Sequence, residues 1–534
     1  MRTTITPAQM QRLEQDFMAQ TGTPGILLME MAAQAVVEAV RRHAMRGSTV
    51  LFLCGPGNNG GDGYAAARLW RMDGGRSLVW ELTGQPKGDA AVNRTLLCLQ
   101  GVVPTAPEEN IPQGVACVVD ALFGTGLTRL LSGEAERLAL LCAERGLPVV
   151  SVDIPSGLNG ETGEGVTVFH ATETVTFHRI KTGLLLGMGP AYTGQLTVAE
   201  IGIPADWGNV PGLRLLTDMD ARRLCPPRPP VSHKGTFGRV VIFAGSTGMA
   251  GAAALCAQAC MRMGAGLTQI ACRESLVPIL QNLVPCATCI PLPEHAGQLS
   301  GEAAERLRQA LEGAHAAAVG CGLGQGADVL PLLHVMSGAE CPVVWDADAL
   351  NLLAATDAPA RKQGDLLTPH PGEAARLLGW DTAGVTAAPL EALRALQARW
   401  GGAVLLKGAT SLMTDGVHTA ANANGSPALA KGGSGDVLTG ILVALLAQRQ
   451  RLKLDSLTVL QLGAFLHGQA GCRAAEACGP TSTTAWEVVQ RLRWPGEEKR
   501  AGGRPVRYGI TGHKGPLPGG AKIVDTFLRP AACL

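Results

Sequence analysis

The chain has 534 residues, which is too long for a single hydrophobic core and predicts two or three domains. Hydrophobic residues make up 46% and charged residues 17%, the composition of an ordinary soluble globular protein. Lysine and arginine (45) nearly balance aspartate and glutamate (44), so the net charge of +1 argues against a nucleic-acid or acidic-membrane partner. The N-terminus lacks a secretion signal and no apolar run could span a bilayer, so we expect a cytoplasmic protein.

Two helices are expected at the start of the chain. Thr6-Pro7 is typical of a helix start, and Met10, Leu13 and Phe17 follow at a spacing that places them on one face. A second helix is predicted over residues 26–40, after a Thr-Pro-Gly turn.

A strand, a glycine loop and a helix follow in that order. The apolar run Thr49–Cys54 suits a buried parallel strand, and it leads into the glycine-rich segment Gly55–Gly63. A helix is then predicted over Tyr64–Trp70. This order predicts a phosphate-binding turn of Rossmann type, although the glycine spacing differs from GxGxxG.

Two more strands of the first half end in a carboxylate beside glycine. They are Val115–Asp120 and Leu147–Asp153. The carboxyl ends of parallel strands meet at one edge of a sheet, where open α/β proteins bind ligands. An acidic residue at one strand end is also ordinary turn chemistry. Together with the strand that leads into Gly55–Gly63, these make three polar strand ends beside glycine, which favour a ligand site.

Proline density at residues 225–230 predicts a linker between a first domain, 1–224, and a second domain, 231–494. A second series of strands and helices begins beyond it. Its strands are expected at 239–244, 316–320, 343–346, 365–368 and 403–408. Residues 495–534 are rich in Gly, Pro, Arg and Lys without apolar periodicity, and we predict a disordered tail with no assigned function.

The last glycine-rich segment of this series precedes an apolar helix. Lys431–Asp436 leads directly into an apolar run at helical spacing, so the glycines lie at a helix N-terminus. Free N–H groups and the helix dipole make that end an anion site, and Gly433 and Gly435 let the backbone approach a phosphate. Asp436 has two interpretations: a base that takes a proton from a hydroxyl next to a phosphoryl donor, or a residue that only stabilises the helix start.

Several long motifs resemble the family of bifunctional NAD(P)HX epimerase/dehydratases, which repair hydrated nicotinamide cofactors. The first half resembles the epimerase domain through GNNGGDG (57–63), DALFGTGL (120–127) and DIPSGLNGETG (153–163). The second half resembles the ribokinase-like dehydratase domain. The motifs there are HKGTFGRVVIFAGSTGMAGAA (233–253), WDADALNLL (345–353), TPHPGEAARLL (368–378), LLKGAT (405–410) and GGSGDVLTG (432–440). The resemblance implies two three-layer αβα domains of the α/β class, Rossmann-like and then ribokinase-like.

The resemblance assigns roles in the first domain. Asp153 is implied as the acid/base residue that contacts the substrate. A potassium ion is implied on the hard oxygen ligands of Asn59, Asp120 and Ser156. The residues implied to hold the hydrated cofactor are Asn58, Asn59, Gly60, Gly61, Asp62, Gly124, Thr125, Gly126, Leu127, Thr128, Arg129, Leu130 and Asp153.

In the second domain the resemblance implies an adenine nucleotide, ADP with Mg²⁺, and the hydrated nicotinamide side by side. Asp436 is the implied catalytic base. The nucleotide would contact Lys407, Gly408, Ala409, Thr410, Ser411 and Gly435, and the hydrated nicotinamide would face Ala250, Gly324, His370 and Asp436.

The implied function is an isomerase joined to a lyase. It interconverts the R and S forms of NAD(P)HX and dehydrates the S form to NAD(P)H at the expense of ADP. Phosphorylation would turn the ring hydroxyl into a leaving group, and loss of phosphate would restore the double bond. The partners expected are NADHX or NADPHX, the nucleotide and further copies of the same chain in a homo-oligomer.

Two alternatives remain open from the residues. The first is a ribokinase-type small-molecule kinase, although kinases of this kind usually carry Asn where His370 stands and lack an NNGGDG domain. The second is a non-catalytic binding module in the first domain, although its carboxylates Asp62, Asp120 and Asp153 are all present.

Overall fold

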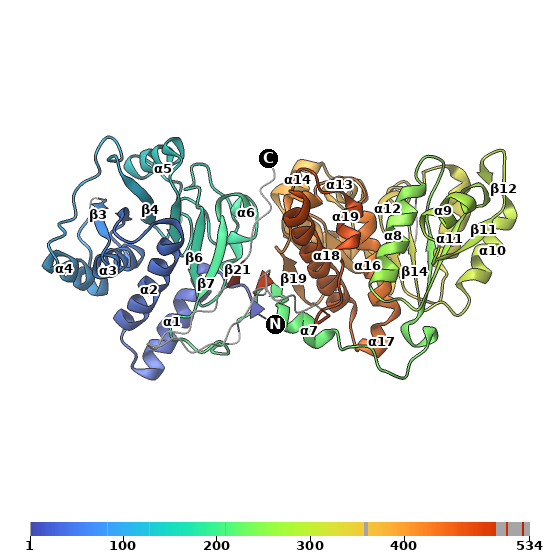
Figure 1. The fold of residues 1–534 in the computed structure, drawn as a ribbon, viewed down its shortest axis with the longest axis horizontal. Coiled ribbons are helices and arrows are strands. Elements are labelled where there is room, and N and C mark those ends of the chain that lie inside the picture. The colour runs from blue at the N-terminus through green and yellow to red at the C-terminus, as the bar shows by residue number, and fades with distance from the viewer. Residues whose placement is uncertain are drawn as a thin grey trace. The chain divides into compact units, whose positions relative to one another are not determined.

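The computed structural model describes residues 2–497 apart from 83, 128, 209 and 357–360, and the backbone of the paired strands β20 (Gly509–Ile510) and β21 (Thr526–Phe527). The basic tail predicted over 495–534 therefore lies almost wholly outside the described residues. The chain forms two compact units that divide between Leu213 and Arg214 (Figure 1). None of the helices in the described part of the chain is long and apolar enough to cross a membrane.

The first unit is built on a six-stranded parallel sheet in the order β3-β2-β4-β5-β6-β7. The short strand β1 (Arg2–Thr3) precedes it. The sheet strands are β2 (Thr49–Cys54), β3 (Arg76–Glu81), β4 (Val115–Ala121), β5 (Val149–Val152), β6 (Glu173–Phe177) and β7 (Gln195–Ala199). The helices are α1 (Pro7–Thr21), α2 (Gly25–His43), α3 (Asn58–Met72), α4 (Gly88–Leu99), α5 (Glu134–Arg145), α6 (Gly189–Tyr192) and the 3₁₀ turn η1 (Thr182–Leu184).

Alternate residues of the central strand β2 enter two different cores. Val50 and Phe52 pack with residues of α1, α2 and α3 on one face. Leu51 and Leu53 pack with residues of α5 on the other face. Because side chains of a strand alternate between faces, the sheet is covered by helices on both sides. The predicted three-layer αβα architecture of this unit is confirmed.

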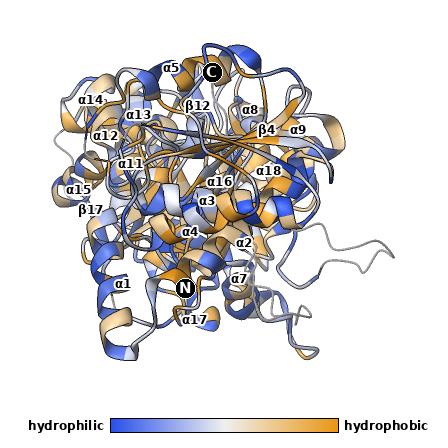
Figure 2. Cartoon of the chain, turned by 90° about the vertical axis from the view of Figure 1, so that its left-hand side faces the viewer, coloured by the Kyte–Doolittle hydropathy of each residue, from blue (hydrophilic) through white to orange (hydrophobic). Residues whose placement is uncertain are grey.

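The predicted first helix is confirmed in detail. Thr6 caps α1 by accepting a hydrogen bond from the Gln9 amide, and Met10, Leu13 and Phe17 are its buried residues. Hydrophilic and hydrophobic positions alternate along α1 in Figure 2. The spacing of three apolar residues therefore identified the buried face.

The glycine-rich segment after β2 is largely helical rather than a loop. The helix expected from Tyr64 begins six residues earlier, at Asn58. Glycine is a poor helix former, but tight packing requires it here. A Cβ on Gly60 would lie 1.8 Å from the Gly55 carbonyl oxygen, and one on Gly63 would lie 2.6 Å from the Ala121 Cβ. Tertiary packing therefore overrides local propensity in this turn.

The second unit has a mixed sheet that includes, in order, β8-β19-β18-β17-β16-β15-β14-β9-β10-β11. Only the pairs β17–β18 and β18–β19 in that order are antiparallel. The strands are β8 (Arg214–Leu215), β9 (Arg239–Phe243), β10 (Leu267–Arg273), β11 (Thr288–Leu292), β14 (Ala316–Val319), β15 (Val343–Trp345), β16 (Arg361–Leu367), β17 (Gly401–Leu406), β18 (Ser411–Thr414) and β19 (Thr419–Asn422). The strands β12 (Glu294–His295) and β13 (Gln298–Leu299) form a separate hairpin.

Helices surround this sheet as a ribokinase-like α/β fold requires. They are α7 (Asp218–Leu224), α8 (Ala250–Arg262), α9 (Val277–Leu283), α10 (Gly301–Leu311), α11 (Leu330–Ser337), α12 (Ala347–Ala354), α13 (Pro371–Leu378), α14 (Thr382–Ala387), α15 (Pro389–Trp400), α16 (Ser434–Ala447), α17 (Arg449–Leu452), α18 (Ser456–Cys478) and α19 (Ala485–Gln490). Short 3₁₀ turns are η2 (Lys234–Phe237), η3 (Glu274–Leu276), η4 (Ala327–Val329) and η5 (Pro427–Leu429).

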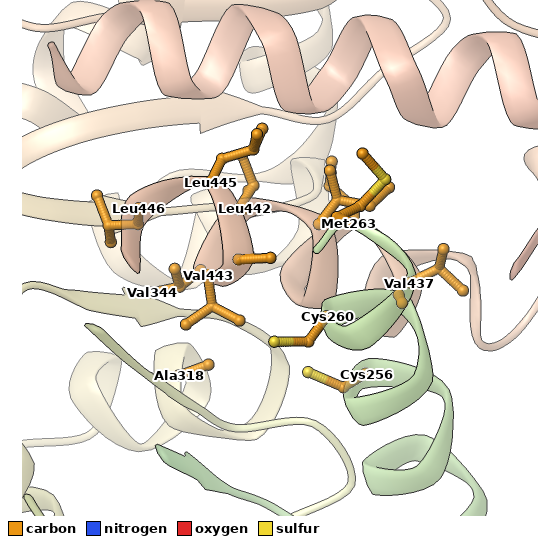
Figure 3. Packing of buried hydrophobic residues seen from close by; sticks show 14 of the residues in the cluster. Cys256, Cys260, Met263, Ala318, Val344, Val437, Leu442, Val443, Leu445 and Leu446 are labelled. Atoms are coloured by element: carbon orange, nitrogen blue, oxygen red, sulfur yellow. The ribbon is translucent and has the colours of Figure 1, made fainter. Parts of the chain in front are cut away.

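Helix α16 lies in the centre of the largest core. Its residues from Val437 to Ala447 are all buried, and they pack with residues of α8, α18 and the sheet (Figure 3). A helix that is apolar on every side is stable only when other elements enclose it. The N-terminus of α16 is therefore held rigidly at the edge of the sheet.

The proline-rich segment does not separate the two units. Residues 214–224 belong to the second unit, and Cys225 is buried in its core. The Pro226 carbonyl accepts a hydrogen bond from Trp494 Nε1 at 3.1 Å. The predicted linker at 225–230 is therefore a surface loop of the second unit, and the boundary lies eleven residues earlier. A run of prolines marks a break in regular structure, and such breaks also occur inside domains.

Candidate functional site

Most residues predicted for the first site lie at the carboxyl edge of three adjacent strands. Asn58–Asp62 form the first turn of α3 after β2, Asp120 is in β4, and Gly124–Leu127 follow β4. Asp153 and Ser156 follow β5. Arg129 and Leu130 are exposed, and Thr128 lies outside the described residues.

Asp120, Ser156 and Asn59 form a cluster of polar groups beneath this edge. The fully buried Asp120 carboxylate accepts hydrogen bonds from Ser156 Oγ at 2.6 Å, the Ser156 amide at 2.8 Å and Ser151 Oγ at 2.9 Å. The Asn59 side chain lies against Gly124, where a Cβ would be 2.7 Å from Asn59 Oδ1, and its Nδ2 is buried without a partner. The cluster therefore brings several side-chain oxygen atoms close to the unpartnered Asn59 Nδ2.

Asp153 forms a buried ion pair with Lys181, a residue that sequence reasoning missed. Lys181 Nζ is 2.6 Å from Asp153 Oδ1, and its side chain is 1% exposed. Thr176 Oγ1 donates to the same oxygen at 3.0 Å, and Lys181 Nζ also donates to the Phe177 carbonyl at 3.0 Å. Asp153 has a φ of 66°, a left-handed conformation that strains a residue with a Cβ. The surroundings fix this carboxylate in one orientation.

Two further carboxyl groups face this ion pair. Burial raises the pKa of Asp62 well above its usual range, and the charge of Asp153 raises it further. Burial also raises the pKa of Glu14 to about 7, although the Lys181 ammonium opposes that shift. The site thus brings an ion-paired carboxylate next to two acids whose pKa values are raised.

The glycines predicted at a helix N-terminus in the second unit do lie at the start of α16. Gly433 is the N-cap of α16 with φ of 89°, which a residue with a side chain rarely adopts. Gly435 lies in the first turn, where a Cβ would be 3.5 Å from Lys407 Nζ. Ser434 Oγ lies 3.2 Å from His467 Nε2 of α18, whose pKa burial lowers to about 4. Free amides of the first turn and a lysine therefore meet at one place.

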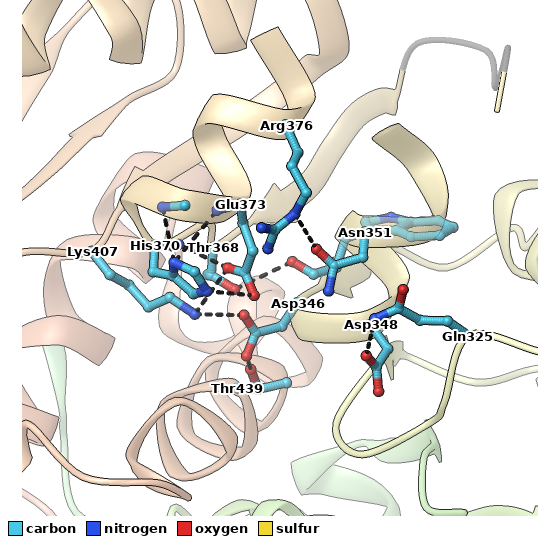
Figure 4. Close-up of polar contacts among 12 residues, drawn as sticks. Gln325, Asp346, Asp348, Asn351, Thr368, His370, Glu373, Arg376, Lys407 and Thr439 are labelled. Carbon is cyan, nitrogen blue, oxygen red and sulfur yellow. Dashed lines mark hydrogen bonds and ion pairs between the residues drawn. The ribbon is translucent and has the colours of Figure 1, made fainter. Parts of the chain in front are cut away.

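Lys407 is held at the centre of a charged network (Figure 4). Its Nζ is 2.8 Å from Asp346 Oδ1 and 3.7 Å from Glu373 Oε2. Thr439 Oγ1 of α16 donates to Asp346 Oδ2 at 2.7 Å. Burial opposes the charged form of Lys407, but Asp346 and Glu373 together raise its pKa. The lysine is therefore a fixed cation beneath the glycine loop.

His370 caps α13 and is oriented by its own capping contacts. Its Nδ1 accepts hydrogen bonds from the amides of Gly372 at 3.0 Å and Glu373 at 3.4 Å. Burial lowers the pKa of His370, and Lys407 lowers it further. A neutral imidazole with Nδ1 as acceptor carries its proton on Nε2, which lies 3.3 Å from Glu373 Oε1.

Asp436 lies next to this network in the first turn of α16. Burial raises its pKa to about 6, and the negative charge of Asp346 contributes to the rise. Lys407 opposes the shift. A carboxylate with this pKa is ionised near neutral pH but binds a proton more readily than an ordinary aspartate.

The other predicted residues flank this centre. Gly324 donates its amide to Asp348 Oδ2 at 2.9 Å, and a Cβ on it would be 3.5 Å from Ser246 Oγ, in the loop that leads to Ala250. Gly408 and Ala409 are exposed after β17, Thr410 has a buried Oγ1 without a partner, and Ser411 begins β18. Gly408 and Ala409 follow Lys407 directly in the chain and are exposed, so they are accessible to a ligand.

Sequence reasoning missed Lys181, Asp346, Glu373 and Thr439 as site residues. Asp346 had a usable signal, because it ends a strand like Asp120 and Asp153. Lys181 is the only charge in the run IKTGLLLG, but burial alone does not show which residue it contacts. Within the described residues, no group of three or more His, Cys, Asp or Glu side chains is arranged to hold a metal ion.

Comparison with known proteins identifies the two units. Residues 26–183 match the family described as YjeF-related protein N-terminus, and residues 240–492 match the family described as NAD(P)H-hydrate dehydratase. A solved structure from Bacillus subtilis, an ADP/ATP-dependent NAD(P)H-hydrate dehydratase crystallised with ATP and Mg²⁺, is 30% identical. It covers 53% of this chain and 96% of its own, with a TM-score of 0.45.

Two curated relatives span nearly the whole chain. The bifunctional NAD(P)H-hydrate repair enzyme Nnr of Vibrio cholerae is 36% identical over 493 residues, which is 91% of this chain and 97% of that protein. The enzyme of the same name from Escherichia coli is 35% identical over 477 residues, 87% of this chain and 88% of its own. Both units of the present fold are therefore matched in the same order, and the chain belongs to the family of bifunctional NAD(P)H-hydrate repair enzymes.

Proposed function

We propose that this chain repairs hydrated nicotinamide cofactors in two steps. The first unit interconverts the R and S forms of NAD(P)HX, and the second dehydrates the S form to NAD(P)H at the expense of ADP. The names of the curated relatives support this activity. The observation that carries the second step is the position of Asp436, with a pKa of about 6, in the first turn of α16 beside Lys407.

In the dehydration step Asp436 accepts the proton of the ring hydroxyl as the phosphoryl group of ADP arrives. The amides of the first turn of α16 and the Lys407 ammonium stabilise the charge on the transferred oxygens. The new ring phosphate then leaves as inorganic phosphate, the neighbouring ring carbon loses a proton, and the double bond re-forms. His370, whose Nε2 lies 3.3 Å from Glu373 Oε1, would face the nicotinamide ring.

The nucleotide fits the residues that the second unit presents. The exposed residues Gly408 and Ala409 follow Lys407 directly, and Gly435 lies beside the Lys407 ammonium at the helix start. These groups, with Ser411, would hold the phosphates and the adenosine. The magnesium ion would bind through the phosphate oxygens, as is usual for Mg²⁺ in phosphoryl transfer. ADP is proposed as the donor in preference to ATP.

The first unit supplies two carboxyl groups in different surroundings. Asp153, paired with Lys181, can accept a proton, and Asp62, whose pKa is raised, can donate one. Such a pair suits a reaction in which a ring hydroxyl leaves as water from one face and water returns to the other. Asn58–Asp62 and Gly124–Leu130 are proposed to hold the cofactor around this pair.

A potassium ion is proposed in the cluster of Asp120, Ser156 and Asn59. The donor set fits, because the Asp120 carboxylate, the Ser156 hydroxyl and Asn59 Oδ1 are hard oxygen ligands of the kind that potassium takes. The ion would brace the loop between β4 and α5 against the start of α3.

The test uses the intact chain and a mixture of both epimers of hydrated NADH. With ADP and Mg²⁺, the reduced-nicotinamide absorbance should return completely, and inorganic phosphate should be released. Asp153→Ala should stop the recovery after the S form is consumed, beyond spontaneous epimerisation. Accumulation of a stable phosphorylated product would instead identify a small-molecule kinase, and full recovery without nucleotide would exclude the phosphorylation mechanism.

A further inference from the structure

Asp346 connects the two elements on which the proposed dehydration depends. It follows β15 directly and is 1% exposed. Its Oδ1 accepts from Lys407 Nζ at 2.8 Å, and its Oδ2 accepts from Thr439 Oγ1 at 2.7 Å (Figure 4). Lys407 follows β17, and Thr439 lies one turn after Asp436 on α16. One carboxylate therefore ties a strand-end cation to the helix that carries the proposed base.

The backbone around Asp346 is held in a single conformation. Its amide donates to the Val319 carbonyl at 3.1 Å, and its carbonyl packs so closely on Gly320 that a Cβ there would lie 1.8 Å away. The next residue, Ala347, has a φ of 47°, which is unfavourable for a residue with a Cβ. Strain of this kind persists only where the surrounding structure enforces it.

The negative charge of Asp346 also raises the pKa of Asp436. The groups that face Asp436 are Asp346 and Asp348 from the start of α12, Lys407 from the end of β17 and the Cys321 thiol from the end of β14. Burial opposes ionisation of Asp346, but Lys407 and Thr439 more than compensate and hold its pKa below the usual range. A negative charge thus stands near the proposed base, and the Lys407 ammonium is engaged by Asp346 and Glu373.

We propose that Asp346 is a positioning residue for dehydration, which engages the Lys407 ammonium so that Asp436 remains a free and effective base beside the phosphate loop. The inference rests on the proposed function of this site and deepens it. Without the Asp346 charge, Lys407 would pair with Asp436, because Asp436 is in the first turn of α16 and the Lys407 ammonium lies beside that turn. Asp436 would then be a weaker base, and the cation would leave the position in which it meets the phosphates.

The test measures the pH dependence of kcat/KM for dehydration by the intact chain with ADP and Mg²⁺. In the wild type, activity should fall on the acid side as Asp436 becomes protonated, near its pKa of about 6. Asp346→Asn should move this acid limb to lower pH by about one unit and lower the plateau rate about tenfold. The nucleotide titrates in the same way in both assays, so a difference in the acid limb between the wild type and Asp346→Asn comes from the protein.

Asp365→Asn is the matched control. Asp365 is also buried on this sheet, where it accepts from the Val343 amide and Trp345 Nε1, but it lies outside the site. This variant should lose stability and keep the acid limb of the wild type. An acid limb that stays in place in Asp346→Asn, or that moves equally in Asp365→Asn, would overturn the inference.

Thr439 provides a second variant that keeps every charge and remains informative if Asp346→Asn does not fold. Thr439→Val removes the hydroxyl that orients Asp346, so the rate should fall several-fold with the acid limb unmoved. Thr439→Ser retains the hydroxyl and should restore most of the rate. Equal rates for Thr439→Val and the wild type would overturn the positioning role. A wild-type chain that does not dehydrate hydrated NADH at all would instead refute the proposed function.

Discussion

Each unit places a lysine against an aspartate at the carboxyl edge of its parallel strands, but the two pairs differ in what the aspartate does. Lys181 is 1% exposed and contacts Asp153, the proposed reacting group of the first unit, at 2.6 Å. Lys407 is 21% exposed and contacts Asp346, which is not the proposed base, at 2.8 Å. The proposed base of the second unit, Asp436, is left without the cation.

This difference suits the two proposed reactions. In the first unit the Lys181 ammonium lies against Asp153, and burial raises the pKa of the neighbouring Asp62 carboxyl. In the second unit the base must take a proton close to the negative phosphates, and a pKa raised to about 6 favours that transfer. In the first unit, therefore, the lysine contacts the proposed reacting carboxylate itself. In the second unit it contacts the aspartate beside the proposed base.

The largest effect is expected from Asp436→Asn, which keeps the shape of the side chain and removes the base. Dehydration should fall by roughly 10²–10⁴-fold, as for loss of a general base. Nucleotide binding, measured by calorimetry, should persist because the glycine loop and Lys407 are intact. Asp455→Asn is the control, since Asp455 caps the start of α18 and lies outside the site. Near-normal turnover of Asp436→Asn would show that Asp436 only stabilises its helix.

Replacing each lysine with methionine would separate the two pairs. Lys181→Met leaves an uncompensated buried carboxylate, so epimerisation should be lost and stability should fall by about 3–5 kcal/mol. Lys407→Met should abolish dehydration but cost less stability, because this lysine is partly solvated. Thermal unfolding and the two single-step assays would measure both. The exposed Lys87→Met is the control in the first unit, and equal destabilisation by the two site variants would contradict the comparison.

The proposed potassium site belongs to the first unit alone. Exchange of potassium for lithium should therefore slow epimerisation several-fold, since a smaller ion draws its oxygen ligands inward and displaces the loop after β4. Dehydration of the purified S epimer should not change. Equal slowing of both steps would point to a general salt effect, and no slowing of epimerisation would remove potassium from the proposal.

The central strands of each sheet could be predicted from the sequence, whereas strands toward the sheet edges were missed. The strands expected from apolar runs were β2, β4 and β5 in the first unit, and β9 and β14–β17 in the second, and each set is contiguous in its sheet. Central parallel strands are buried on both faces and read as unbroken apolar runs. The missed strand β11 is largely only half-buried, and β6 carries Glu173, Thr174 and Thr176, so neither reads as such a run.

The same limit applies to the sites. Residues at strand ends and helix starts, such as Asp120, Asp153 and Asp436, could be predicted because local patterns place them at a known edge. Lys181 and Thr439 could not, because each acts through a contact with a distant residue: 28 positions separate Lys181 from Asp153, and 93 separate Thr439 from Asp346. Only packing of the whole unit brings such partners together.

The smallest effect expected concerns Glu14, whose pKa is raised chiefly by burial to about 7, from 4.5 in an unfolded chain. Between these two values the unfolded chain loses its proton and the folded chain retains it, so the wild type loses stability as pH rises. Glu14→Gln cannot ionise and should gain stability relative to the wild type over that interval, with a constant difference above it. Thermal unfolding at about pH 5 and pH 8 should show a gain of a few degrees at the higher pH only.

Glu134→Gln is the matched control for that measurement. Glu134 lies in the same unit, and its hydrogen bond with Arg137 lowers its pKa, so its replacement should give no gain at high pH. A difference between Glu14→Gln and the wild type that is flat across pH would mean that Glu14 is ionised in the folded state. Near Asp153, Asp62 would then be the remaining carboxyl group with a raised pKa.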